Sequence, residues 1–102
     1  MENKINEYLE YLKSDYKKWG DNSHTSSSMY IEYCNGLSVK YGNKYAKVSN
    51  KGSTHSFVVL KDNGKFKKGD ILKAASFSAP ATNKSRGNVL TDDYVVISWA
   101  GA

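Results

Sequence analysis

The chain has 102 residues, of which 39% are hydrophobic and 13% aromatic, and its formal net charge is +5. This length fits one domain, residues 1–102, with a single modest core. One cysteine, Cys34, excludes an internal disulfide, and no apolar run approaches the roughly 18–20 residues of a membrane span. The N-terminal pattern is not that of a signal peptide, so we expect a soluble protein that stays in the cytoplasm.

An amphipathic helix is predicted over residues 1–20. Apolar side chains recur there with the three- and four-residue spacing of one helix face. The stripe consists of Ile5, Tyr8, Leu9, Leu12, Tyr16 and Trp19. The polar, turn-like stretch at residues 21–28 follows and predicts a linker within the domain.

The remainder, residues 29–102, is predicted to be mainly β. Short runs alternate apolar and polar side chains, and turn residues separate them. Strands are predicted at residues 29–34, 37–41, 45–48, 54–60 and 94–99. Asn35-Gly36 is a type I′ hairpin signal, and residues 71–75 fit either a strand or a short helix. We expect an α+β fold in which the helix packs on a curved antiparallel sheet, or a small open β-barrel, of about five to six strands.

Positive charge is concentrated in the middle of the chain. Residues 36–90 contain eleven Lys and Arg against two acids, a local balance of +9, whereas residues 1–35 contain four Lys against six acids. Such a concentration builds a field that attracts polyanions and acidic protein surfaces.

Catalytic and metal-site signals are weak. His24 and His55 have no metal-ligand spacing, and the predicted turn next to Cys34 supplies no obvious helix N-terminus to activate a thiol. Asp92-Asp93 is more typical of a solvated turn than of an acid and base pair. With no nucleotide-binding or nucleophile motif, we expect a protein that is not an enzyme and that needs no cofactor or metal.

The basic centre is the candidate binding region. On a strand, Tyr45 and Lys47 share one side, where a ring can stack on a base while lysines hold phosphates; buried tyrosines opposite solvated lysines are the alternative. Arg86, the sole arginine, lies beside Gly87 and suits bidentate contact with an anion, although an ordered structural loop fits equally well. The candidate residues are Lys40, Lys44, Tyr45, Lys47, Lys65, Lys67, Lys68, Lys73, Asn83, Lys84, Arg86 and Asn88.

Two stretches resemble a group of small bacteriophage proteins. They are KFKKGDILKAA at residues 65–75 and APAxNxxRGNV at residues 79–89. The resemblance covers about residues 44–101, including the final aromatic run. It implies a phage or prophage source and expression inside a bacterium, and proteins of this kind commonly act by binding.

The charge pattern and the resemblance together predict a small phage accessory protein that binds nucleic acid or a host complex that handles nucleic acid. One alternative is an inhibitor of a host defence system, such as an anti-CRISPR-like protein, that docks on a host protein. Another is a structural component of the virion. Self-association through the helix stripe is possible, but packing on the protein's own sheet accounts for that stripe.

Overall fold

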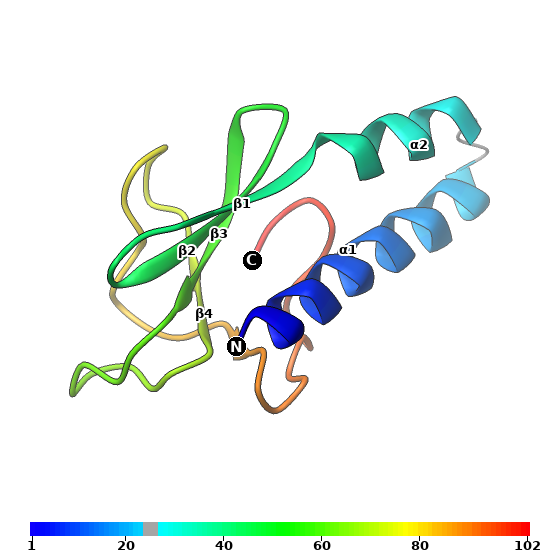
Figure 1. The fold of residues 1–102 in the computed structure, drawn as a ribbon. Helices are drawn as coiled ribbons and strands as arrows, with labels where there is room; N and C mark the ends of the chain where they lie inside the picture. Colours follow the sequence, from blue (N-terminus) through cyan, green and yellow to red (C-terminus); the bar gives the residue numbers. More distant parts are fainter. Residues whose placement is uncertain (24–26) are drawn as a thin grey trace.

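Two helices precede a five-stranded antiparallel sheet in a computed structural model that describes residues 1–23 and 27–102 (Figure 1). The elements are α1 (Glu2–Ser23), α2 (Ser27–Gly36), β1 (Leu37–Tyr41), β2 (Tyr45–Asn50), β3 (Ser53–Val59), β4 (Asp70–Lys73) and β5 (Gly87–Asn88). The strands lie in the order β1-β2-β3-β4-β5, each antiparallel to the next. The predicted α+β class is therefore confirmed, and the sheet is open.

Helix α1 covers one face of the sheet, as the apolar stripe predicts. Ile5, Tyr8 and Leu12 are completely buried in one cluster with inward-facing side chains of β2, β3 and β4. Burying each such side chain contributes about 1.5–3 kcal/mol. Trp19 ends the stripe and remains 42% exposed. The helix continues to Ser23, past the predicted end at residue 20.

Residues 29–34 form part of α2, so the predicted strand is wrong. A strand would place Met29, Ile31 and Tyr33 on one face, but Met29 and Ile31 are 50% and 56% exposed while Tyr33 is buried. The Tyr33 ring stacks on Tyr16 of α1, with ring centroids 4.4 Å apart and planes 8° from parallel. Packing against α1 therefore selects the helical period over the alternating one.

The connections around α2 also differ from the prediction. Of the predicted linker, residues 21–23 belong to α1, residues 27–28 belong to α2, and residues 24–26 lie outside the described part. Asn35-Gly36 ends α2 and leads directly into β1, without a hairpin turn. A Cβ on Gly36 would lie 2.8 Å from Asn50 Oδ1 and from Lys51 Cγ, so a larger residue here would require those side chains to move. Within the described residues, neither helix is long and apolar enough to cross a bilayer.

The sheet has apolar side chains on both faces. Predicted strands at residues 37–41, 45–48 and 54–60 are present as β1, β2 and β3, and the ambiguous stretch at residues 71–75 supplies most of β4. One face contacts α1, and the opposite face, which we call the outer face, carries its own buried cluster. This second cluster consists of Phe57, Val59, Phe66 and Leu72.

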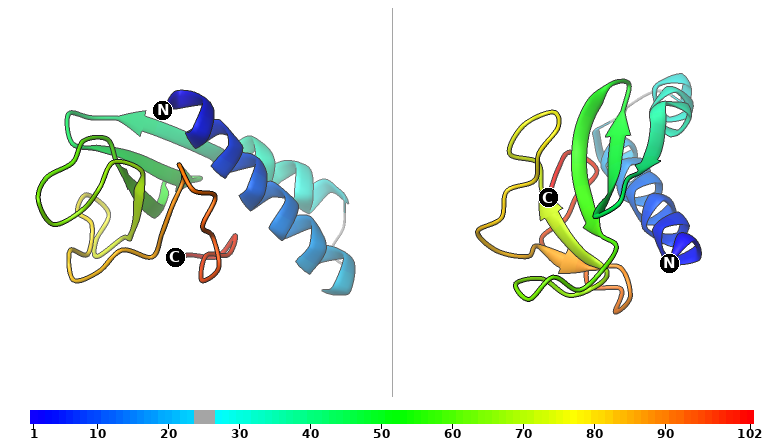
Figure 2. Two further views of the ribbon diagram at one scale, coloured as in Figure 1. Left: turned by 90° about the horizontal axis from the view of Figure 1, so that it is seen from below. Right: turned by 60° about the vertical axis from the view of Figure 1, so that its left-hand side comes forward.

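Residues 94–99 form an irregular segment against α1 instead of the predicted strand (Figure 1 and Figure 2). The Tyr11 hydroxyl donates to the Ile97 carbonyl (2.7 Å), and the Trp99 N–H donates to Asp15 Oδ2 (2.9 Å). Since helix side chains take these backbone groups, they are not used in a strand ladder. The C-terminal segment is therefore fixed to the first helix.

Candidate nucleic-acid interface

A row of side chains crosses the outer face of the sheet. The register pairs Lys40 with Lys47, Lys47 with Phe57, and Phe57 with Leu72. Side chains at paired positions point to the same face, so Lys40 and Lys47 lie on the face that carries the buried cluster with Phe57 and Leu72. Like charges directly opposite each other destabilise a sheet, and an anion bound between them would remove that cost.

The hairpin between β1 and β2 adds further basic and aromatic groups. Lys44 is exposed at the turn, and Tyr45 is half-buried on the same face as Lys47. The Tyr45 ring meets Phe57 edge-on, with centroids 5.9 Å apart. A depression of about 240 Å³ opens here and is lined by Lys40, Tyr41, Gly42, Asn43, Lys44, Tyr45, Lys47, Phe57 and Ser78.

The loop after β4, whose Ser78 lines this depression, carries the exposed side chain of Phe77. The ammonium group of Lys47 lies 4.0 Å from the centroid of the Phe77 ring, a cation–π contact. Phe77 is nevertheless 62% exposed, so Lys47 covers only part of the ring. We call the set Lys40, Lys44, Tyr45, Lys47 and Phe77 the basic-aromatic patch.

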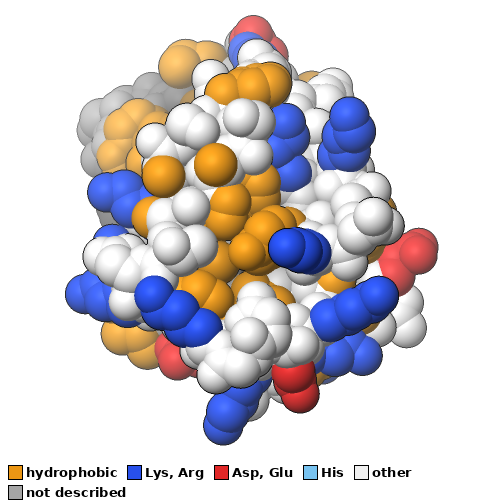
Figure 3. All heavy atoms as spheres, turned by 90° about the vertical axis from the view of Figure 1, so that its left-hand side faces the viewer, with side chains coloured by type: hydrophobic (Ala, Val, Ile, Leu, Met, Phe, Trp, Pro, Cys, Tyr) orange, Lys and Arg blue, Asp and Glu red, His pale blue; other side chains and the backbone are white. Residues whose placement is uncertain are grey.

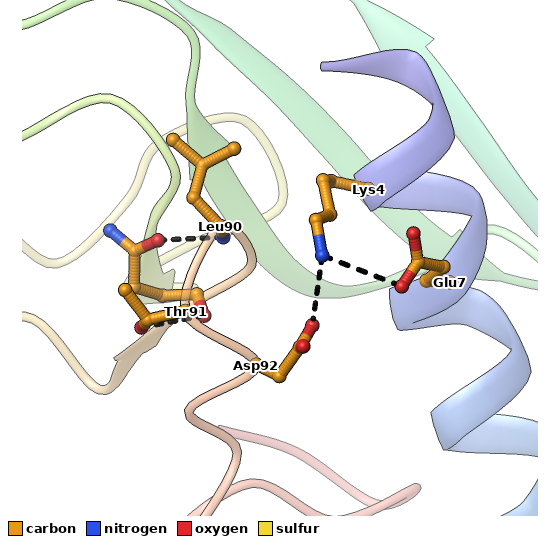
Figure 4. Close-up of polar contacts among 6 residues, drawn as sticks. Lys4, Glu7, Leu90, Thr91 and Asp92 are labelled. Carbon is orange, nitrogen blue, oxygen red and sulfur yellow. Dashed lines mark hydrogen bonds and ion pairs between the residues drawn. The ribbon is translucent and has the colours of Figure 1, made fainter.

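The lysines of this patch are not neutralised within the described residues. The ion pairs found there are Lys4–Glu7, Lys4–Asp92, Lys13–Glu10 and Lys51–Glu32. Figure 4 shows Lys4 directed toward Glu7 and Asp92, an exposed bridge between α1 and the loop after β5. Figure 3, which shows the side away from the helices, has many blue cationic side chains around hydrophobic surface and few red acidic ones. The positive charge of this side therefore remains available to a partner.

The two acids within the basic segment bind backbone groups. Asp62 Oδ1 accepts the N–H of Lys68 (2.6 Å), and Asp70 Oδ2 accepts the N–H of Lys67 (2.9 Å). These bonds shape the loop that presents Lys65, Lys67 and Lys68. Lys65 lies 5.6 Å from the centroid of the Phe66 ring, at the border of the outer cluster.

Lys73 lies apart from the patch. It pairs with Ser56, whose side chain faces α1, so the register assigns Lys73 to the face opposite Lys47. Of the predicted binding residues, the structure thus brings together Lys40, Lys44, Tyr45 and Lys47 in one place. Lys65 borders the same face, and Lys73 does not join it.

Lys84 and Arg86 line a second and larger depression, of about 580 Å³, with Asp70 and Asp93 also in its wall. The Nε atom of Arg86 is buried and has no hydrogen-bond partner within the described residues. Asn83 is exposed on the same loop. Because this depression contains both signs of charge, it attracts an anion less strongly than the patch.

Asn88 is engaged within the protein. Its amide nitrogen donates to Asp70 Oδ1 (2.9 Å) and to the Lys68 carbonyl (3.2 Å), and its Oδ1 accepts the Leu90 N–H (2.7 Å). The adjacent Gly87 is required because a Cβ there would collide with the Asp93 carbonyl. This part of the loop follows the alternative interpretation, an ordered structural connection.

A hydrogen-bonded chain surrounds His55. Its Nε2 lies 2.8 Å from the Ser98 carbonyl and must donate to it, so Nδ1 accepts the hydroxyl of Ser56 (2.8 Å). Ser56 in turn contacts the Tyr8 hydroxyl at 2.8 Å. Burial lowers the pKa of His55, partly opposed by its bond to Ser98. Ser56 is completely buried, whereas His55 is partly exposed and lines a depression of about 290 Å³ together with Tyr33, Asn50, Ser53, Thr54, Trp99 and Ala100.

No protein-family model, curated protein or solved structure matches the chain. The residues described here contain no group of three or more His, Cys, Asp or Glu able to hold a metal ion. Cys34 is a free, partly buried thiol, and His24 lies outside the described part.

Sequence reasoning missed Phe77. Nothing in its immediate neighbours distinguishes it from a core phenylalanine, since its exposure depends on how the loop folds back over β3. The available signal is its place in a loop rich in Ser and Ala close to the only proline, Pro80. An aromatic side chain within such a loop is a candidate for exposure.

Proposed function

We propose that the protein is a non-enzymatic binding module whose basic-aromatic patch binds nucleic acid. The observation that supports this most directly is the paired position of Lys40 and Lys47, which form no ion pair among the described residues. Lys47 also lies beside the exposed ring of Phe77. Lysines supply sequence-independent affinity for phosphates, and neighbouring rings supply stacking surface for bases.

The patch predicts a salt-dependent affinity. Lys40, Lys44, Lys47 and Lys65 are enough for roughly three to four phosphate contacts on a single strand, which corresponds to about 20- to 50-fold weaker binding between about 50 and 200 mM salt. Fluorescence anisotropy with a labelled oligonucleotide measures this change. Absence of binding at about 50 mM salt would refute the proposal.

A matched pair of variants separates the patch from net charge. Lys40→Gln with Lys47→Gln removes two positive charges from the patch, and Lys18→Glu changes the charge equally on the exposed surface of α1. We expect the double variant to reduce the salt slope by about 1.4 and Lys18→Glu to leave it near the wild-type value. Equal effects would mean that the whole molecule's charge, and not the patch, drives binding.

A second candidate is docking on a host protein, as an inhibitor would. The observation that favours it is the apolar exposure of the loop after β5, where Val95 is 91% and Val96 is 62% exposed. Adjacent exposed aliphatic side chains of this kind are common at protein interfaces. A stoichiometric protein partner that remains bound after nuclease treatment, and that Val95→Ser with Val96→Ser releases, would favour this function over nucleic-acid binding.

A further inference from the structure

We infer that the basic-aromatic patch selects single-stranded nucleic acid over duplex, with the Phe77 ring stacking on an unpaired base and Lys47 contacting the adjoining phosphate. This inference depends on the proposed function and specifies its substrate. It assigns a recognition role to Phe77. Electrostatic binding through the lysines alone would not require this ring.

The protein holds the Phe77 ring at the tip of a turn. The Ala79 carbonyl accepts the N–H groups of Ala75 (3.0 Å) and Ser76 (3.1 Å), which closes the turn beneath the ring. The hydroxyl of Thr54 on β3 donates to the Phe77 carbonyl at 2.7 Å and fixes the turn to the sheet. The Phe77 ring is 62% exposed and contributes little burial to the core, so its presentation on a fixed turn favours a role in contact with a partner.

Lys47 links the ring to the charged part of the patch. Its ammonium group is 4.0 Å from the Phe77 centroid and extends from the strand position directly opposite Lys40. A nucleotide whose base stacks on Phe77 carries its phosphate toward this pair of lysines. Stacking and ion pairing can therefore act on the same nucleotide.

The neighbouring depression has room for a base. Its volume is about 240 Å³, and its lining includes Ser78, the residue after Phe77, together with the rings of Tyr45 and Phe57. Since a cavity of about 150 Å³ accommodates benzene, this depression is large enough for a planar base, next to the turn whose residue Ser78 lines it. Lys44 at its rim provides a further phosphate contact.

The exposed ring of Phe77 explains why an unpaired strand is preferred. In a duplex, each base is stacked on its neighbours and presents only its edges to a protein. Stacking on Phe77 would require that a base leave the helix, which costs a few kcal/mol in a duplex and least in a single strand. Lysine contacts alone do not discriminate in this way, because both forms present phosphates.

The test uses the full chain, a roughly 20-nucleotide oligo(dT) that contains one 2-aminopurine, and the same sequence as a duplex. Phe77→Leu keeps an apolar side chain without a ring face, whereas Phe77→Trp keeps and enlarges that face. We expect Phe77→Leu to weaken single-strand binding about 5- to 150-fold and Phe77→Trp to preserve it. Binding to wild type should quench 2-aminopurine, and Phe77→Leu should abolish the quenching.

The outcomes separate this inference from the proposed function. If Phe77→Leu binds as tightly as wild type while the Lys40→Gln, Lys47→Gln variant loses affinity, stacking is refuted and the electrostatic proposal stands. If wild type binds the duplex as tightly as the single strand, the preference inferred here is refuted. If wild type binds neither probe at about 50 mM salt, both proposals fail.

Discussion

Protonation of His55 should destabilise the protein, because the fold favours the neutral ring. Burial lowers the pKa of His55 below its usual value of about 6.5, so the unfolded chain binds a proton more readily than the folded one. The free energy of unfolding is then unaffected by this group well above pH 6.5 and falls as the pH drops below it. A proton on Nδ1 also removes the acceptor for the Ser56 hydroxyl.

The size of the effect follows from linkage. The loss grows by at most about 1.4 kcal/mol for each pH unit below 6.5, which sets an upper bound of about 2 kcal/mol at pH 5. Domains of this size have total stabilities of about 5–15 kcal/mol, which makes such a loss measurable. Urea unfolding of wild type and His55→Gln at several pH values between 5 and 8 provides the comparison.

The variant isolates His55 from every other titrating group. His24 and all carboxylates are present in both proteins, so only the difference in pH dependence reports on His55. We expect the stability of His55→Gln to fall less steeply below pH 6.5 than that of wild type, whatever its value at pH 8. Parallel curves from pH 8 to pH 5 would refute the reasoning, as would an NMR titration that gives His55 an ordinary pKa.

Two further predictions concern stability. Leu12→Ala should lower the free energy of unfolding by about 2–5 kcal/mol, because it opens a cavity in the core, whereas Ile31→Ala on exposed α2 should change it by less than about 0.5 kcal/mol; similar losses would contradict the helical assignment of α2. Asn88→Ala should cost about 1–3 kcal/mol by leaving Asp70 and the Leu90 N–H without their partner, and an unchanged unfolding midpoint would contradict this.

The sequence predicts local structure well where one pattern extends over many residues. The α1 stripe runs for four turns, so its period is unambiguous, and the turns after β1 and β2 contain glycine and asparagine. At residues 29–34 the pattern is too short to separate a strand from a helix, and the deciding contact, Tyr33 on Tyr16, is made with a distant segment. At residues 94–99 the backbone groups bind helix side chains, which no local pattern records.

In the candidate site, too, the features set by local sequence could be predicted, and those set by contacts with distant segments could not. Tyr45 and Lys47 were predicted to share a side, and strand alternation is enough to place them together. The position of Lys73 on the other face depends on strand register, and the internal role of Asn88 depends on Asp70, 18 residues away. The position of Phe77 could not be predicted from the sequence, because it depends on how the loop after β4 folds over β3. Sequence reasoning therefore finds the charge of the patch but not its aromatic centre.

The attachment of the C-terminal segment to α1 has a consequence for biosynthesis. Tyr11 and Asp15 bind Ile97 and Trp99, more than 80 positions later in the chain. Because α1 is synthesised first and residues 94–99 last, these contacts can form only after β1 to β5 have all been synthesised.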